Sequence, residues 1–308
     1  MTETLPLIIF VPGMKPKPPP ALHHDALLRC LSEGLRRVAP DVAKTLDAHP
    51  ECFVRADWTW VFYQRYRDIA IDLPGIDALI AQKTPSEVDR NEAMSLATRL
   101  TRYVFLLGDA LPFLINSLAG DDMRVTLADV ARYVDNRKGI GDEVRSDLIA
   151  HLRDAALRKR PVLLIGHSLG SVISWDALWE LSRKHEAPVG VDMFMTLGSP
   201  LGNRVIQRGL RGRHASGIDR YPDNINRWVN MVAYGELTAL DRRMQNDYAD
   251  MLSEGLVGSI EDYDVFNHYR EGKRLLVHSE YGYLVNETTA GLIASWWREH
   301  YNTDRTHA

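Results

Sequence analysis

Cysteine is scarce in this chain, and its N-terminus does not resemble an export signal. Only two of the 308 residues are cysteines, Cys30 and Cys52, which is too few for a disulfide framework. The apolar run 5–11 is too short for the core of a signal peptide, and no basic residue precedes it. We therefore expect a cytoplasmic protein with reduced thiols.

Long apolar runs and an excess of one charge are also missing. No stretch of about 20 apolar residues is free of charge, so no membrane span is predicted. The chain has 37 basic and 41 acidic residues, a formal net charge of -4, which argues against nucleic acid as the main partner. Residues 23–25 (His-His-Asp) lack the spacing of metal ligands and no H-E-x-x-H motif occurs, so no metal site is predicted.

The most informative segment lies at 161–171. An unbroken apolar run, Val162 to Ile165, predicts a strand that is buried on both faces. Residues 166–170 are Gly-His-Ser-Leu-Gly, a match to G-x-S-x-G, and residues 172–178 can form a helix. Strand, sharp turn and helix are the setting that a nucleophile elbow requires, so Ser168 is the candidate nucleophile. The alternative is a glycine-rich turn between strand and helix in another doubly wound protein.

The two glycines of this motif have a steric reason. A serine at the tip of a strained turn needs neighbours without a Cβ, so that strand and helix can pass close to each other. Ser168 then lies at the positive end of a helix, where backbone N–H groups point towards the reaction zone.

The oxyanion hole of such a site needs two backbone donors. One is expected to be the amide of Leu169, the residue after the nucleophile, and the other comes from the loop after the first strand, residues 11–14. Pro12 has no N–H, so Gly13 and Met14 are the candidates and Met14 is preferred. The alternative is that this loop is only a turn.

A serine nucleophile also needs a base within hydrogen-bond reach. The base follows the serine and the acid in the chain order that goes with this elbow, and six histidines lie after Ser168. His278 is preferred, because it directly follows the segment 274–277 (Arg-Leu-Leu-Val), which we expect to be the last strand. His268 is the alternative.

The acid of the triad is expected just after the penultimate strand, 225–233. Glu236 lies close behind the end of this strand, directly after a glycine, and is preferred. The alternative acid is Asp241, five residues further along, which could instead cap a helix or pair with nearby arginines.

The pattern of elements predicts an α/β fold with a mostly parallel central sheet, because strands alternate with helices throughout. Aromatic and β-branched residues at 53–63 predict a strand with Trp58, Trp60 and Phe62 on one face. We expect strands at 5–11, 53–63, 162–165, 191–197, 225–233 and 274–277, and helices at 22–38, 87–107, 127–134, 144–157 and 284–300.

The whole chain, 1–308, is expected to be one domain, with a helical insertion or cap at 65–125, before the nucleophile strand. Within the insertion, Leu96 to Leu118 is strongly apolar but is interrupted by charged residues, glycine and proline. This segment is either a pair of buried helices or a cap over an acyl-binding pocket. In the second case Phe105 and Phe113 would contact the substrate.

Taken together, the elbow 166–170, the loop 11–14, the strand end 198–201 (Gly-Ser-Pro-Leu) and the segment 278–281 (His-Ser-Glu-Tyr) resemble α/β-hydrolase lipases and esterases. In particular, they are similar to bacterial serine hydrolases of the lipase-like branch. The resemblance implies an α/β-hydrolase fold and hydrolysis of an ester, thioester or amide through an acyl-enzyme. It implies a small-molecule ester or acyl substrate and no cofactor.

Two other functions remain open at this level. An acyltransferase or thioesterase would use the same triad, with an alcohol or thiol in place of water in the case of acyl transfer. A non-catalytic protein with the hydrolase fold would bind a ligand or partner, but it would not need a nucleophile and a base at the expected strand ends.

Overall fold

Six parallel strands form the central sheet, in the order β2-β1-β3-β4-β5-β6. The computed structural model describes residues 5–95, 121–183, 189–236 and 243–301, without the side chains of 121–127. The strands of the sheet are β1 (Leu7–Val11), β2 (Phe53–Arg55), β3 (Val162–His167), β4 (Val191–Leu197), β5 (Ile225–Ala233) and β6 (Ser259–Val265). The expected α/β architecture with a mostly parallel sheet is therefore confirmed.

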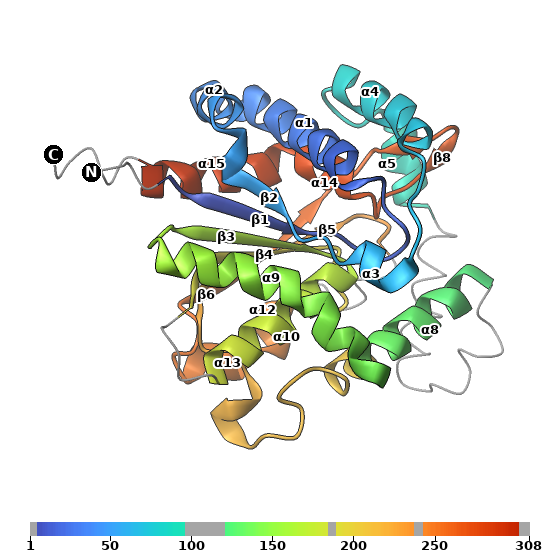
Figure 1. The fold of residues 1–308 in the computed structure, drawn as a ribbon. Helices are drawn as coiled ribbons and strands as arrows, with labels where there is room; N and C mark the ends of the chain where they lie inside the picture. Colours follow the sequence, from blue (N-terminus) through green and yellow to red (C-terminus); the bar gives the residue numbers. More distant parts are fainter. Residues whose placement is uncertain (1–4, 96–120, 184–188, 237–242, 302–308) are drawn as a thin grey trace, which may run out of the picture.

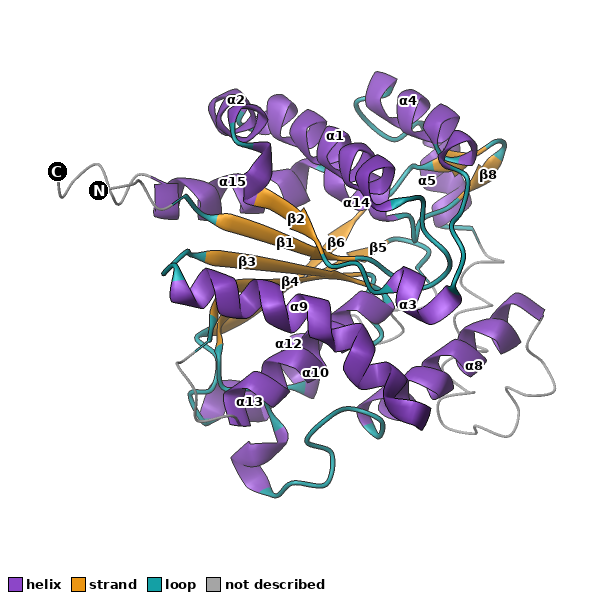
Figure 2. Cartoon of the chain, in the orientation of Figure 1, coloured by secondary structure: helices purple, strands orange, loops and turns teal. Residues whose placement is uncertain are grey.

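Helices cover both faces of this sheet (Figures 1 and 2). The longer helices are α1 (Pro20–Val38), α2 (Pro40–Ala48), α4 (Leu73–Ala81), α5 (Glu87–Ala93), α8 (Asp121–Val134), α9 (Ile140–Leu157), α10 (Leu169–Arg183) and α15 (Glu287–Tyr301). The shorter ones are α3 (Thr59–Tyr63), α11 (Arg204–Gln207), α12 (Met244–Asp247), α13 (Ala249–Ser253) and α14 (Glu280–Val285).

The side chains of β1 divide between two hydrophobic cores. Leu7, Ile9 and Val11 pack with α9 and α10 on one face of the sheet. Ile8 and Phe10 pack with α1 and α15 on the other face. A strand covered on both faces has no position for a polar side chain, and this explains the unbroken apolar runs of β1 and β3.

The neighbouring strands β1 and β3 lead to opposite faces of the sheet. The helix after β1, α1, belongs to one core, and the helix after β3, α10, belongs to the other. The two loops therefore diverge at the carboxyl ends of adjacent strands. This is the topological switch point, where open α/β sheets form a crevice that can hold a ligand.

Helix α10 crosses β1 and β3 at very short range. A Cβ on Gly170 would lie 2.2 Å from the backbone oxygen of Val11, and one on Gly166 would lie 2.6 Å from the Cα of Ser171. Both obstacles are backbone atoms, which have no freedom to rotate away. The steric reason inferred for the two glycines of the motif is therefore present in the structure.

The predicted strand at 53–63 is wrong beyond its first three residues. Only Phe53–Arg55 forms a strand, and α3 follows at Thr59–Tyr63. Trp58 and Phe62 are buried whereas Trp60 is 39% exposed. A spacing of four residues puts two side chains on the same face of a helix, so the alternating aromatics conceal a helical pattern.

The last strand of the sheet is also different from the prediction. Residues Arg274–Leu275 form β8, which pairs with β7 (Arg270–Glu271) in a separate antiparallel hairpin. The sixth strand of the main sheet is instead β6, which the sequence analysis missed. Its acidic residues pair with β5: Glu261 binds Arg227 at 2.8 Å and Asp262 accepts from Asn230 at 2.9 Å. Charged side chains are typical of an edge strand.

Two other expectations meet the structure in part, and a third, the cap, is not tested by it. The closing helix is divided at Asn286 into α14 and α15, and the Asn286 side chain caps the second of them through the amides of Thr288 and Thr289. The described part of the insertion, 65–95 and 121–125, is largely helical. Residues 96–118, with Phe105 and Phe113, lie outside the described residues, so the cap stays a prediction.

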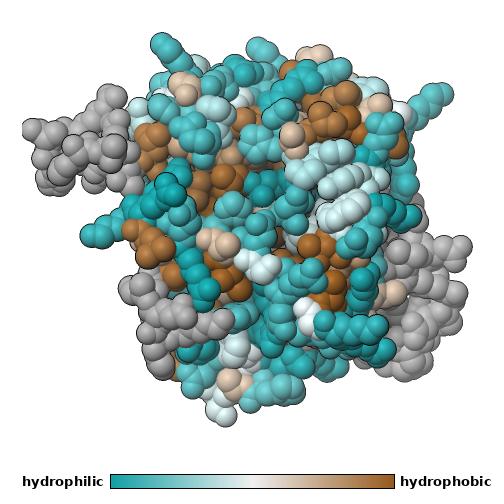
Figure 3. Space-filling view, viewed as in Figure 1, coloured by the Kyte–Doolittle hydropathy of each residue, from teal (hydrophilic) through white to brown (hydrophobic). Residues whose placement is uncertain are grey.

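Among the residues that the structure describes, no helix is long and apolar enough to cross a bilayer. On the face shown in Figure 3, hydrophobic residues lie in separate patches between hydrophilic ones. Scattered apolar side chains of this kind are common on protein surfaces.

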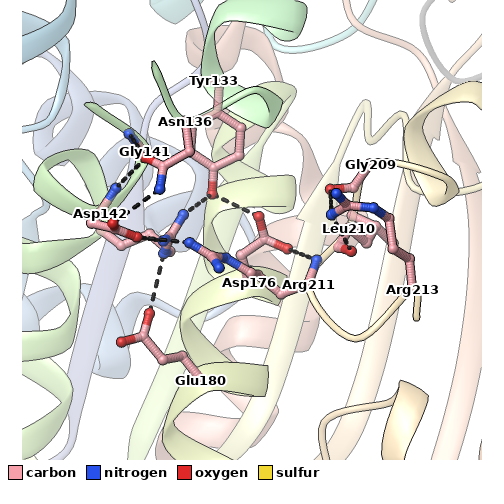
Figure 4. A network of polar contacts seen from close by, with 11 residues as sticks. Tyr133, Asn136, Gly141, Asp142, Asp176, Glu180, Gly209, Leu210, Arg211 and Arg213 are labelled. Carbon is pink, nitrogen blue, oxygen red and sulfur yellow. Dashed lines mark hydrogen bonds and ion pairs between the residues drawn. The ribbon is translucent and has the colours of Figure 1, made fainter. Parts of the chain in front are cut away.

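A buried polar network joins α8, α9 and α10 on the face of the sheet that α10 covers (Figure 4). The hydroxyl of Tyr133 donates to Asp176 at 2.8 Å and accepts from Arg145 at 3.1 Å, and the amide of Arg211 donates to the other oxygen of Asp176 at 2.8 Å. Burial raises the pKa of Asp176 to about 6, although these donors oppose the shift. The network attaches α8 to the helix that follows Ser168.

Gly170→Ala is expected to destabilise the fold by roughly 3 kcal/mol, because the added Cβ meets backbone that cannot move aside. Gly291→Ala on α15 is the matched control. Its Cβ would meet nothing within 4 Å, and alanine should stabilise the helix by up to ~1 kcal/mol. Urea unfolding of both variants measures the difference. Equal stability of the two variants would contradict the close crossing.

The pH dependence of stability is expected to carry a contribution from Asp176. Its folded pKa, about 6, lies above the unfolded value of about 4. The folded state therefore holds this proton more tightly, and the stability gained from it is complete below about pH 4 and lost as the pH rises through about 6. The free energy of unfolding of the wild type should fall by ~2–3 kcal/mol relative to Asp176→Asn over this range. Chemical denaturation at several pH values tests this, and a difference independent of pH would refute it.

Candidate active site

Ser168 lies in a strained turn between β3 and α10. Its φ is +51°, in the left-handed region that non-glycine residues rarely adopt. The turn is held because the Ser168 amide donates to the carbonyl of Leu197 at 2.9 Å, while the Ser168 carbonyl accepts from the amide of Ser171 at 3.0 Å and from its hydroxyl at 2.6 Å. The strand, turn and helix predicted from the G-x-S-x-G match are all present. Strain of about 1–3 kcal/mol in one residue persists only where its surroundings hold it.

The end of β4 is joined to the same turn. The hydroxyls of Ser171 and Ser199 share a hydrogen bond at 2.7 Å, and the amide of Leu201 donates to Ser199 Oγ at 3.2 Å. The segment 198–201, singled out in the sequence, therefore supports the turn at Ser168 from the neighbouring strand.

The loop after β1 contacts Ser168 from the other side. A Cβ on Gly13 would lie 2.9 Å from the Cβ of Ser168, so glycine allows this approach. Aromatic side chains hold the loop on both sides of Gly13: Trp58 Nε1 donates to the carbonyl of Pro12 at 2.9 Å, and the amide of Lys15 donates to the hydroxyl of Tyr63 at 3.0 Å.

Three amides beside Ser168 are available as donors. Those of Gly13 and Met14 have no acceptor among the residues that the structure describes. Leu169 is the first residue of α10, where an amide has no partner within its own helix. These are the amides expected to form an oxyanion hole, and their role stays a prediction.

The structure brings His278 and Glu236 together. His278 Nδ1 lies 2.9 Å from Glu236 Oε2, and since a carboxylate only accepts, the nitrogen donates. Glu236 is 2% exposed and accepts a second hydrogen bond from the hydroxyl of Tyr283 at 3.1 Å. In the neutral imidazole this leaves Nε2 of His278 as the acceptor, which is the tautomer a general base requires.

The position of Gly198 indicates that His278 and Glu236 lie beside Ser168. A Cβ on Gly198 would be 2.9 Å from His278 Nδ1 and 3.1 Å from Glu236 Oε2. Gly198 directly follows Leu197, whose carbonyl binds the Ser168 amide. Ser168, His278 and Glu236 therefore come together at the carboxyl ends of β3, β4 and β5. His278 reaches this place from the loop after the β7–β8 hairpin, not from a strand of the main sheet as expected.

Of the alternative base, His268, and the alternative acid, Asp241, the structure describes only the first. His268 follows β6 and is 8% exposed; its Nε2 donates to the carbonyl of Gln82 at 3.1 Å, and burial lowers its pKa. Asp241 lies outside the described residues, as part of 237–242. In the described ranges, no group of three His, Cys, Asp or Glu side chains is arranged to hold a metal ion.

A buried cluster next to the site was not anticipated. The carboxylate of Glu280 accepts from His23 Nε2 at 2.7 Å and from Lys17 Nζ at 2.9 Å, and lies 3.3 Å from His167 Nδ1. The other ring nitrogen of His167, Nε2, donates to the carbonyl of His278 at 2.8 Å. His167 and Glu280 stand inside the motifs noted in the sequence, but nothing in the sequence indicates that they are buried together.

Burial acts on the charges of this cluster in different ways. By itself it raises the pKa of Glu280, but the charge of Lys17 and the contacts with His23 and His167 outweigh it, so this pKa lies well below its usual range. Burial lowers the pKa of His23 to about 4 and also lowers that of His167. At neutral pH the cluster therefore contains one carboxylate, one ammonium group and two neutral imidazoles.

A second unanticipated residue supports the loop of His278. Asn267 follows β6, and its side-chain amide donates to the carbonyl of Ser279 at 2.7 Å while its oxygen accepts from the amide of Tyr269 at 3.2 Å. The sequence analysis did not predict strand β6, so it gave no reason to single out the asparagine that follows this strand.

Comparison of the chain with protein-family models, curated proteins and solved structures found no match in any of the three. The chemistry of this site therefore rests on its own residues.

Proposed function

We propose that this chain is a serine hydrolase with an α/β-hydrolase fold, which cleaves carboxylic esters through an acyl-enzyme. The observation that carries the proposal is the convergence at the switch point. The strained turn of Ser168 lies beside the hydrogen-bonded pair of His278 and Glu236, and against the loop of Gly13. A binding protein would have no need of this combination.

The geometry supports the following reaction. Ser168 Oγ attacks the ester carbonyl while Nε2 of His278 takes its proton, and the buried Glu236 stabilises the imidazolium that forms. The amides of Leu169 and of Met14 or Gly13 donate to the oxyanion. As the tetrahedral intermediate collapses, His278 returns the proton to the leaving alcohol.

The second half of the reaction repeats these roles with water. His278 removes a proton from water, which attacks the acyl-enzyme, and Ser168 is released with its proton restored. An alcohol or thiol in place of water would make the same site an acyltransferase. The side chains of the site supply every proton transfer, so the proposed reaction needs no cofactor.

Labelling with a fluorophosphonate is the direct test of the nucleophile. The reagent phosphonylates an activated serine oxygen and releases fluoride, so the wild type should be labelled and Ser168→Ala should not. Ser174→Ala is the matched control, because the Ser174 hydroxyl donates to the carbonyl of Gly170 within the same helix. This variant should therefore still be labelled at Ser168. Circular dichroism checks that all three proteins are folded. Labelling that persists in Ser168→Ala would refute the assignment.

Glu236→Gln is expected to lower kcat by roughly 10²–10⁴-fold on p-nitrophenyl acetate, and His278→Ala by at least ~10³-fold. The amide of glutamine cannot stabilise an imidazolium as a carboxylate does. Tyr283→Phe keeps the carboxylate and removes only one of its donors, so its loss should be much smaller. Asp241→Asn and His268→Ala are measured beside them. A larger loss in either of these would move the corresponding role to that residue.

A further inference from the structure

Glu280 forms the centre of a charged cluster that the proposed reaction does not use. It is 4% exposed, and three residues from separate parts of the chain meet it: Lys17 from the loop before α1, His23 from α1, and His167 from β3. Removing such charges from water costs free energy, and apolar side chains of similar volume often give equal stability. The cluster therefore calls for a reason other than stability.

His167 connects this cluster to each part of the candidate site. It directly precedes Ser168, and its Nε2 donates to the carbonyl of His278 at 2.8 Å. The rings of His167 and His278 lie 4.7 Å apart between centroids. A Cβ on Gly13 would lie 2.7 Å from Nδ1 of His167, so the ring also borders the loop after β1. An apolar side chain at 167 would make none of these polar contacts.

We propose that Glu280 and His167 are positioning residues for the proposed hydrolysis, on which this inference rests: His167 holds the backbone of His278 beside Ser168, and Glu280 binds Lys17 and His23 next to the ring of His167. Lys17 joins the same carboxylate to the loop that carries Gly13 and Met14. The nucleophile, the base and the oxyanion loop are thereby held by one set of buried contacts. A displacement of about 1 Å between such groups can cost ~10²-fold in rate.

The hydrogen bonds of Glu280 go to Lys17 and His23 and not to the ring of His167. Nε2 of His167 must carry hydrogen to donate to the His278 carbonyl, so in the neutral ring Nδ1 has no hydrogen to donate, and it forms no hydrogen bond with Oε2 of Glu280, which lies 3.3 Å away. The Lys17 ammonium and the N–H of His23 occupy the other oxygen of Glu280 and balance its charge. Glu280 thus adds a negative charge, and Lys17 a positive one, close to the base.

Other charged groups near the cluster have their own partners. Arg55 on β2 binds Asp57 at 3.0 Å, and Asp72 before α4 binds Arg67 at 2.9 Å and accepts from the hydroxyl of Tyr281 at 3.1 Å. The charges that change in the test below are therefore those of Glu280 and Lys17.

The test compares Glu280→Gln, His167→Ala, His167→Gln and Lys17→Met with the wild type. The readouts are the rate of fluorophosphonate labelling, kcat and KM on p-nitrophenyl acetate, and the melting temperature. Glu280→Gln and His167→Ala should lower labelling and kcat by ~10–100-fold with little change in KM. His167→Gln should recover part of the rate, because its side-chain N–H can reach the His278 carbonyl. His24→Ala, a neighbour on α1 outside the cluster, should match the wild type.

The pH profile of kcat/KM separates positioning from a merely structural role. Glu280→Gln removes a negative charge close to the base, so the acid limb of the pH profile should move to lower pH. Lys17→Met removes a positive charge, and the acid limb should move to higher pH. A structural role alone would lower the melting temperature and leave the acid limb of both variants where it is in the wild type. If Glu280→Gln does not fold, the direction in which the acid limb of Lys17→Met moves decides between the two roles.

Two failures are distinguishable. A wild type that the probe does not label would overturn the proposed function, and this inference with it. A wild type that is labelled, with cluster variants that react as fast and keep the same pH profile, would overturn the positioning role alone. Loss of rate without rescue by His167→Gln and without opposite pH shifts would also overturn it.

Discussion

The close crossing of α10 over β1 is the contact on which the candidate site depends. Because Gly170 has no side chain, the start of α10 lies against the backbone at the end of β1. This approach places the turn of Ser168 beside the loop of Gly13, on the neighbouring strand of the sheet. A larger residue at 170 would separate helix and strand, and the available amides of the loop would no longer lie next to the serine.

Two buried carboxylates show how partners decide the effect of burial. Asp176 accepts hydrogen bonds from neutral donors, a tyrosine hydroxyl and a backbone amide, and burial raises its pKa to about 6. Glu280 is as deeply buried, but it contacts the ammonium of Lys17 directly, and its pKa lies well below the usual range. At Asp176 the two donors and the charges of Arg145 and Arg211 offset only part of the desolvation, whereas at Glu280 the charge of Lys17 and the contacts with His23 and His167 more than offset it. The first network joins helices, and the second lies against the candidate base.

The errors of the sequence analysis have a common physical origin. Aromatics at 58, 60 and 62 alternate as in a strand, but Trp58 finds an acceptor in the carbonyl of Pro12 and packs with Phe62 as helical neighbours. Strand β6 was missed because its acidic residues hide the pattern, and they are tolerated at an edge next to polar groups of β5. In both cases long-range partners outweigh local propensity, and such partners are not visible in a short window of sequence.

The sequence by itself determined the two-sided burial of the central strands, the parallel α/β architecture and the strained turn at Ser168, since apolar runs and glycine positions act over a few residues. It also indicated that His278 and Glu236 belong near this turn, from their order in the chain. Only the tertiary structure decided that these two side chains are hydrogen bonded, that His278 arrives from a hairpin loop, and that His167, Glu280, Lys17 and His23 form one buried cluster. These contacts join residues that are distant in the chain, so they follow from how the layers pack and not from any local pattern.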